Sequence, residues 1–396
     1  MKPQLPNGAK IIIKRLEENG KRAHIVGGCV RDFLLSKEPF DFDITTDALP
    51  EEMKEIFSDM RTIETGIKHG TLTVIAEGVP YEVTTYRVDG EYENHRKPKS
   101  VTFSDSLSAD LSRRDFTMNA ICYSDRDGFI DEFSGREDIK NRIIRAVGEP
   151  GLRFEEDALR ILRALRFAAR LGFSIEEETE KALFSKAHLL RAVSVERIYT
   201  EWYKLLEGRY AYEVIDRYRD IISRFLFAEQ IVLPERDRFD SARAEIRQLS
   251  LFALSRKDSY SAFSDFCDRM KTDAKTKREG TIALSNIGIS LLTETDIRLA
   301  LIKVGQGAVR DISALKEICS LNGAPEEAVI NAVVSSDYPL SLSALAVGGE
   351  DMKAIGFFGK EIGDTLATLL LMTARDEVKN EKEALLYAAE KIKNGI

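Results

Sequence analysis

Two glycines and an arginine near the start of the chain are suited to holding a phosphate group. A short apolar run ends at Gly27 and Gly28, and the helix expected after it carries Arg31. Glycine lets backbone N–H groups approach a phosphate closely. The positive end of a helix and a guanidinium both attract an anion. The pattern therefore predicts a phosphate-binding loop that includes Gly27, Gly28 and Arg31.

A pair of carboxylates follows in the same part of the chain. Asp41 and Asp43 occupy alternate positions of an extended run, so both side chains should leave the same face of a strand. Mg²⁺ prefers a few carboxylates together with phosphate oxygens of a substrate. A glycine turn or an Asp-x-Asp pair alone indicates little, but together they favour metal-assisted phosphoryl transfer. The spacing fits neither a dinucleotide-binding fingerprint nor a P-loop.

A third carboxylate is expected on a neighbouring strand. The run Tyr81-Glu82-Val83 has the composition of a strand, which makes Glu82 a candidate for a supporting catalytic role. An ordinary glutamate on the face of a strand explains this residue equally well. Asp110 is the alternative choice for the same role.

An arginine-rich helix is predicted over residues 154–171. At 100° per residue, its apolar side chains gather on one side of the helix. The opposite side carries Arg160, Arg163, Arg166 and Arg170 and no lysine. Like charges three and four residues apart repel each other, so the pattern favours an anionic ligand over a plain solvated surface. Guanidinium groups have a planar donor fork that can pair with a base edge as well as with a phosphate.

We expect an α/β or α+β head of about 145 residues to position these side chains, ahead of a helical region. Short β-rich runs, turn residues and helices alternate over the first part of the chain, where Val79-Pro80 is expected to connect the two strands of a hairpin. After Gly148 the periodicity is helical, with few alternating runs. A chain of 396 residues with 43% apolar content has room for two or more domains. The predicted fold class is α+β.

Composition narrows the class of protein. Lysine and arginine number 58 against 66 aspartate and glutamate, and the net charge of −8 argues against binding nucleic acid by bulk charge. The four cysteines form no Cys-x-x-Cys pair and the four histidines show no metal-ligand spacing, so neither a disulfide framework nor a zinc site is expected. No apolar run is long enough for a transmembrane helix, and the N-terminus lacks the pattern of a secretory signal. We expect a cytoplasmic protein without a membrane partner.

An ordered series of motifs resembles the class II tRNA nucleotidyltransferases, the CCA-adding enzymes. These share a DNA-polymerase-β-like nucleotidyltransferase fold with bacterial poly(A) polymerases. The likeness is dense up to about residue 200, thin through the middle, and returns in segment 356–363. The matching segments are 26–32, 41–48, 65–71, 82–87, 110–120, 156–160 and 194–198.

The resemblance implies a catalytic head followed by an elongated, all-helical region. The head would span residues 1–147, and a neck that recognises the nucleotide base would span 148–207. A helical body would follow over 208–300 and a tail that binds the tRNA elbow over 301–396. Within the tail, segment 356–363 could present a helix N-terminus to a tRNA phosphate, although an ordinary connection between helices explains it as well.

The reaction implied by the resemblance is nucleotidyl transfer to tRNA. The 3′-hydroxyl of a tRNA would attack the α-phosphate of CTP or ATP and release pyrophosphate. Two Mg²⁺ ions would take part: one, held by Asp41 and Asp43, would lower the pKa of the hydroxyl, and the other would stabilise the leaving phosphate oxygens. Glu82 would support this pair of carboxylates. The expected partners are tRNA and nucleoside triphosphates, with a monomer and a homodimer both left open.

The resemblance also implies a site for the incoming base. Asp157 and Arg160 would pair with the Watson–Crick edge of C or A, as an amino-acid template. Arg163 and Arg166 would complete the nucleotide site, and Arg113 would contact the nucleotide from the head.

Nucleotide specificity is left open within this family. Enzymes that add only CC lack a functional version of loop 87–98, which this chain retains. Asn94, Lys97 and Lys99 depart from the usual residues there. Addition of the full CCA is therefore favoured over addition of A alone or of CC alone. Segment 61–74 resembles the tRNA enzymes more than poly(A) polymerases. A catalytically silent RNA-binding protein is the remaining alternative, which the intact motifs argue against.

Overall fold

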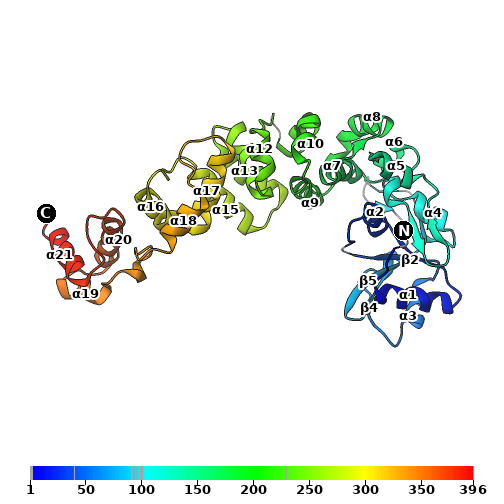
Figure 1. Ribbon diagram of the computed structural model, residues 1–396, viewed down its shortest axis with the longest axis horizontal. Coiled ribbons are helices and arrows are strands. Elements are labelled where there is room, and N and C mark those ends of the chain that lie inside the picture. The colour runs from blue at the N-terminus through cyan, green and yellow to red at the C-terminus, as the bar shows by residue number, and fades with distance from the viewer. Residues whose placement is uncertain are drawn as a thin grey trace. The chain divides into compact units, whose positions relative to one another are not determined.

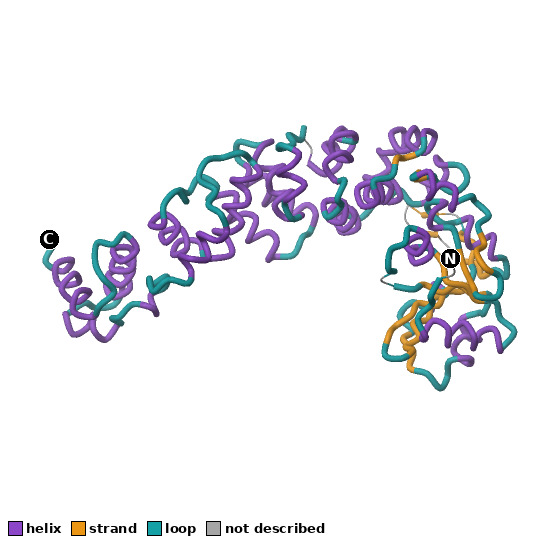
Figure 2. Tube along the Cα trace, viewed as in Figure 1, coloured by secondary structure: helices purple, strands orange, loops and turns teal. Residues whose placement is uncertain are grey.

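Two compact units make up the described chain. The computed structural model describes residues 3–39, 41–90, 92–93, 97–98, 101–227 and 230–395. The first unit extends to Phe225, and the second starts at Leu226. Figure 1 labels their elements, and Figure 2 shows that the strands belong to the first unit while the second consists of helices and loops.

A mixed sheet is the framework of the first unit. Its seven described strands have the order β11-β10-β1-β2-β5-β4-β3. All neighbours are antiparallel except β2 and β5, which are parallel and therefore start at the same edge of the sheet. The strands are β1 (Ala23–Val26), β2 (Asp43–Thr46), β3 (Arg61–Ile63), β4 (Thr71–Ala76), β5 (Val79–Thr85), β10 (Cys122–Ser124) and β11 (Gly128–Ile130).

Amphipathic helices cover this sheet. In α1 (Asn7–Glu18), Ile12 and Leu16 lie one helical turn apart and are fully buried, as expected for the apolar stripe of a helix that packs on strands. Helix α1 contacts β1, β4 and β5. The other helices of this part are α2 (Gly28–Leu34), α3 (Pro50–Ile56), α4 (Leu107–Ser112) and α5 (Gly135–Asn141).

The hairpin of β4 and β5 turns two residues earlier than predicted. Ala76 pairs with Val79, so the connection consists of Glu77 and Gly78, and Val79-Pro80 lies inside β5. Both turn residues have positive φ, 52° for Glu77 and 77° for Gly78. Two consecutive positive φ values match the twist of an antiparallel pair, and this favours the tight turn over the predicted connection.

Three further strand pairs lie outside the main sheet. They are β6 (Arg87–Asp89) with β9 (Val101–Phe103), β7 (Tyr92–Glu93) with β8 (Lys97–Pro98), and β12 (Ile143–Ile144) with β13 (Ser174–Ile175). The last pair joins the end of the head to the segment after the arginine-rich helix. In loop 87–98 and just after it, Asn94 and Lys99 lie outside the described residues, as does the side chain of Lys97.

The prediction of one continuous arginine-rich helix over residues 154–171 is wrong, because the helix is interrupted at Asp157. This residue is extended, with φ −136° and ψ 99°. Its carboxylate accepts a hydrogen bond from the N–H of Leu159 at 3.1 Å, and such a local acceptor competes with the helical backbone bond. The helices of this part are α6 (Pro150–Glu156), α7 (Leu159–Leu171), α8 (Glu177–Lys186), α9 (Val195–Leu206), α10 (Ala211–Arg217) and α11 (Arg219–Ile222).

The described part of the second unit is helical, as predicted. Its elements are α12 (Arg236–Ser241), α13 (Ala244–Ser255), α14 (Ser259–Met270), α15 (Ala274–Ser285), α16 (Glu294–Val304), α17 (Gln306–Ile318), α18 (Glu327–Val334), α19 (Gly349–Ile355), α20 (Lys360–Ala374) and α21 (Lys382–Lys393). No helix among the described residues is long and apolar enough to cross a bilayer.

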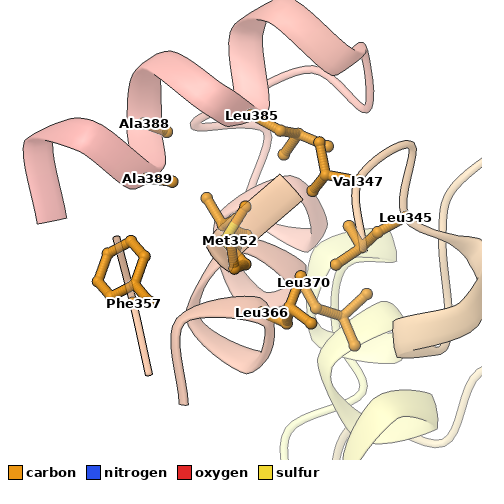
Figure 3. Packing of buried hydrophobic residues seen from close by; sticks show 10 residues of the cluster. Leu345, Val347, Met352, Phe357, Leu366, Leu370, Leu385, Ala388 and Ala389 are labelled. Carbon is orange, nitrogen blue, oxygen red and sulfur yellow. The ribbon is translucent and has the colours of Figure 1, made fainter. Parts of the chain in front are cut away.

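The last three helices share an apolar core. Met352 of α19 is fully buried, and Figure 3 shows it among Leu366 and Leu370 of α20 and Leu385 of α21. Segment 356–363 consists of the connection between α19 and α20, residues 356–359, and the first turn of α20, and a role for it in binding a tRNA phosphate remains a prediction. The predicted boundaries at 147, 207 and 300 remain predictions as well.

Candidate active site

The predicted phosphate-binding loop lies at the end of β1. Gly27 has a φ of 81°, a conformation that favours glycine, and a Cβ atom built there would lie 3.1 Å from an Nη atom of Arg114. A Cβ on Gly28 would lie 3.7 Å from an Nη atom of Arg31. Two guanidinium groups therefore approach the glycine pair. Arg114 was not among the predicted site residues, although it belongs to the matching segment 110–120.

The carboxylates lie on the strands next to this loop. In the register of β1 and β2, Asp43 stands opposite Val26, the residue before Gly27. On β5, Val83 is the partner of Ile44, so Glu82 lies at the level of Asp43. Asp41 precedes β2 and is exposed. The structure thus brings the predicted carboxylates to the edge of the sheet where the glycine loop begins.

The carboxylate cluster carries an excess of negative charge. Asp43 keeps access to solvent, yet desolvation by the surrounding protein and the charges of Asp41 and Glu82 raise its pKa to about 6. Among the described residues, no group of three histidine, cysteine, aspartate or glutamate side chains is arranged to hold a metal ion. The pair Asp41 and Asp43 remains the predicted metal site, and a ligand role for Glu82 remains a prediction.

Asp110, the alternative third carboxylate, has a structural role. It is fully buried and accepts hydrogen bonds from Nε and Nη2 of Arg113 at 2.9 and 2.6 Å. Its other oxygen accepts from Thr45 at 3.2 Å and from Arg114 at 3.3 Å. Burial alone would raise the pKa of Asp110, but the two guanidinium groups hold it below its usual value. Asp110 therefore orients Arg113 and Arg114 and is not available to a metal ion.

Three of the four arginines of α7 form ion pairs with carboxylates of the protein. Arg160 contacts Glu156 at 2.6 Å, Arg163 donates from Nε to Asp115 at 2.8 Å, and Arg166 contacts Glu201 at 2.6 Å. Protein carboxylates relieve the mutual repulsion of these three arginines, and two of the carboxylates, Asp115 and Glu201, come from distant parts of the sequence. An anionic ligand for the arginines remains a prediction.

Asp157 and Arg160 lie at the break between α6 and α7. Asp157 accepts a hydrogen bond from Nη2 of Arg197 at 2.9 Å. Arg160, 7% exposed, donates to the carbonyl oxygens of Arg153 at 3.0 Å and Arg113 at 2.8 Å in addition to Glu156. The second of these bonds fastens α7 to the segment that carries Arg113. The predicted base-binding residues are thus brought together with Arg113, and Arg197 joins them as a residue that had no assigned role.

Asp115 should be an acid-sensitive support of this site. Although burial opposes it, the charge of Arg163 and hydrogen bonds from Asn119 and Arg163 lower the pKa of Asp115 to about 2. Its stabilisation is complete above the unfolded value near 4 and is lost as the pH falls toward 2. We expect Asp115→Asn to lower the free energy of unfolding at pH 7 by about 2 kcal/mol, measured by urea denaturation.

A matched control for Asp115 is Asp59, which forms an exposed pair with Arg15. Because exposed ion pairs contribute little, Asp59→Asn should leave the urea midpoint almost unchanged. An Asp115→Asn protein as stable as the Asp59→Asn protein at pH 7 would contradict the assigned role.

Two family models match the first unit. Residues 23–145 match the model described as "Poly A polymerase head domain", and residues 172–221 match "Probable RNA and SrmB- binding site of polymerase A". A CCA-adding enzyme of Geobacillus sp. (strain WCH70) is 36% identical over 386 residues, which cover 94% of each chain. The chain belongs to the CCA-adding enzymes. The resemblance found in the motifs is thereby confirmed, as is the enzyme class of CCA tRNA nucleotidyltransferases.

Other comparisons agree with this family. The CCA-adding enzyme of Pediococcus pentosaceus is 34% identical over 98% of this chain and 99% of its own length. That of Geobacillus thermodenitrificans reaches 52% identity, but there this chain spans about half the length of the relative, 50%. The crystal structure of Bacillus stearothermophilus CCA-adding enzyme in complex with CTP superposes with a TM-score of 0.81, at 32% identity, over 100% of this chain and 99% of that one. The predicted fold class is confirmed.

Proposed function

We propose that this enzyme completes the 3′ end of tRNA by adding CCA from CTP and ATP. The observation that carries the proposal is the meeting of Asp41 and Asp43 with the Gly27–Gly28 loop at one edge of the sheet, beside Arg31 and Arg114. Carboxylates next to a phosphate loop suit the transfer of a nucleotidyl group. Similarity over nearly the full length to CCA-adding enzymes supports the choice of acceptor.

Asp41 and Asp43 fit the needs of Mg²⁺. Their oxygens are the hard ligands that this ion prefers. Desolvation and then the negative charges of Asp41 and Glu82 raise the pKa of Asp43, and a divalent cation would compensate that charge. When bound, Mg²⁺ would lower the pKa of the attacking 3′-hydroxyl and stabilise the negative charge on the leaving pyrophosphate. We propose two such ions in the active complex, with substrate phosphates completing their coordination.

The protein's own residues would hold the two ends of the nucleotide. The backbone at Gly27 and Gly28 admits the triphosphate, and Arg31 and Arg114 neutralise part of its charge. At the other end, Asp157 and Arg160 would face the base. Three of the five N–H donors of Arg160 are used by acceptors in the described chain, which leaves two for a base edge. We place Arg113, Arg163 and Arg166 between these ends.

Transfer of labelled nucleotides tests the proposal. A tRNA that lacks its terminal CCA is expected to incorporate CTP and then ATP in the presence of Mg²⁺. Incorporation of ATP only into tRNA that already ends in CC would replace the proposal by A addition, and arrest after two C residues would replace it by CC addition. Long poly(A) products from unrelated RNA would favour a poly(A) polymerase. No incorporation of either nucleotide would favour a silent RNA-binding protein.

A further inference from the structure

One aromatic ring contacts three of the predicted nucleotide-binding arginines. Phe167 lies in α7 and is 4% exposed. The guanidinium carbons of Arg31, Arg163 and Arg166 lie 5.1, 5.5 and 4.1 Å from the centre of its ring. The face of an aromatic ring attracts cations, and the attraction grows when water is excluded. Arg31 comes from the phosphate-binding loop and the other two from the base-binding helix, so the ring joins both parts of the site.

Carboxylates fix the edges of the same guanidinium groups. Arg31 contacts Asp32 at 2.7 Å, while Arg163 and Arg166 are paired with Asp115 and Glu201 as described above. Each group is therefore held at its edge by an acid and at its face by the ring. This arrangement lets three like charges gather around one side chain without strong repulsion.

A chain of hydrogen bonds through Asn119 and Asp115 connects Arg31 to Arg163. Arg31 donates from Nη1 to the side-chain oxygen of Asn119 at 2.8 Å, and the amide of Asn119 donates to Asp115 at 3.0 Å. Asp115 in turn accepts from Arg163. Phe116 approaches Phe167 edge-on, with ring centres 5.8 Å apart and planes at 85°. The ring of Phe167 is thus locked in orientation as well as in place.

We propose that Phe167 is a positioning residue of the nucleotide site. Its ring holds Arg31, at the triphosphate end, in one fixed spacing from Arg163 and Arg166, which the proposed function places between the two ends of the nucleotide. This inference rests on the proposed function, in which those arginines bind the nucleotide. A ring that only filled the core could be replaced by any apolar side chain of similar size, and that difference makes the role testable.

Phe167→Leu removes the aromatic face and keeps an apolar side chain. We expect the KM for both CTP and ATP to rise about tenfold or more, and incorporation of UTP and GTP to increase, because the two ends of the site lose their fixed spacing. Phe167→Tyr keeps the ring and should restore both values. Calorimetric binding of CTP provides a second readout that does not require transfer.

Phe154→Leu is the matched control. Phe154 is fully buried in α6, and no cation–π contact involves it in the described part of the chain. Both leucine variants should lower the thermal midpoint by similar amounts, but only Phe167→Leu should weaken CTP binding. Equal KM values for the two leucine variants would overturn the proposal, and so would a Phe167→Tyr protein as impaired as Phe167→Leu. A wild-type protein that binds CTP but transfers nothing would refute the proposed function, while the calorimetric comparison would still decide the role of Phe167.

Discussion

Replacing Asp41 by alanine is expected to lower the rate of nucleotide transfer at least about a thousandfold while leaving tRNA affinity nearly unchanged. The side chain is exposed at the mouth of the carboxylate cluster and makes no hydrogen bond in the described chain, so its loss should cost little stability. Its proposed contribution is to bind Mg²⁺ together with Asp43. Single-turnover transfer from CTP measures the rate of nucleotide transfer, and filter binding measures the affinity for tRNA.

Two comparisons make the Asp41 result specific. Asp41→Asn keeps the size of the side chain but not its charge, and should be as inactive as Asp41→Ala because a neutral amide is a poor ligand for Mg²⁺. Asp59→Asn removes an exposed carboxylate elsewhere in the same unit and should transfer normally. If Asp41→Ala lost tRNA binding and transfer to the same degree, Asp41 would have a folding role instead.

Replacing Arg160 by alanine is expected to remove most of the enzyme's selectivity among nucleoside triphosphates. A guanidinium that pairs with a base edge contributes about 1–3 kcal/mol of discrimination, so the preference for CTP and ATP over UTP and GTP should fall by about ten- to a hundredfold. Arg160→Lys keeps the charge but not the planar fork, and it should lose discrimination as well. Competition between labelled nucleotides for one tRNA measures this ratio directly.

The structural bonds of Arg160 require a control for stability. Its donation to the carbonyl oxygens of Arg113 and Arg153 holds the start of α7, so a lower thermal midpoint is expected along with the loss of choice. Arg170→Ala, at an exposed position in the last turn of the same helix, should change neither quantity. Unchanged selectivity in Arg160→Ala would remove Arg160 from base recognition.

Local patterns of the sequence predicted the parts of the site that depend on neighbours in the chain. The glycine pair and Arg31 come from one strand and the short helix after it, and Asp41 and Asp43 from the next strand. The β1–β2 register then places Asp43 beside the start of the glycine loop. Alternating residues and turn signals were therefore sufficient to predict that these residues come together, while their roles in catalysis remain predictions.

Local sequence patterns could not predict contacts between segments that are far apart in the sequence. The stripe of arginines in the sequence is one-signed, but Asp115 and Glu201 arrive from other segments and pair with two of them. Arg114 is distant from Gly27 in the sequence but lies against it in the fold. The break at Asp157 follows from a single hydrogen bond of a side chain to the backbone, which helical periodicity does not register.

The internal pairing of the α7 arginines bears on how binding responds to ionic strength. A cation that meets a nucleic-acid phosphate contributes to salt dependence by displacing a counterion from the RNA. Arg160, Arg163 and Arg166 are already neutralised by Glu156, Asp115 and Glu201. We therefore expect them to add little to the steepness with which tRNA affinity falls as salt rises, and on a chain of net charge −8 we expect the fit of surfaces to matter more to a tRNA complex than long-range attraction.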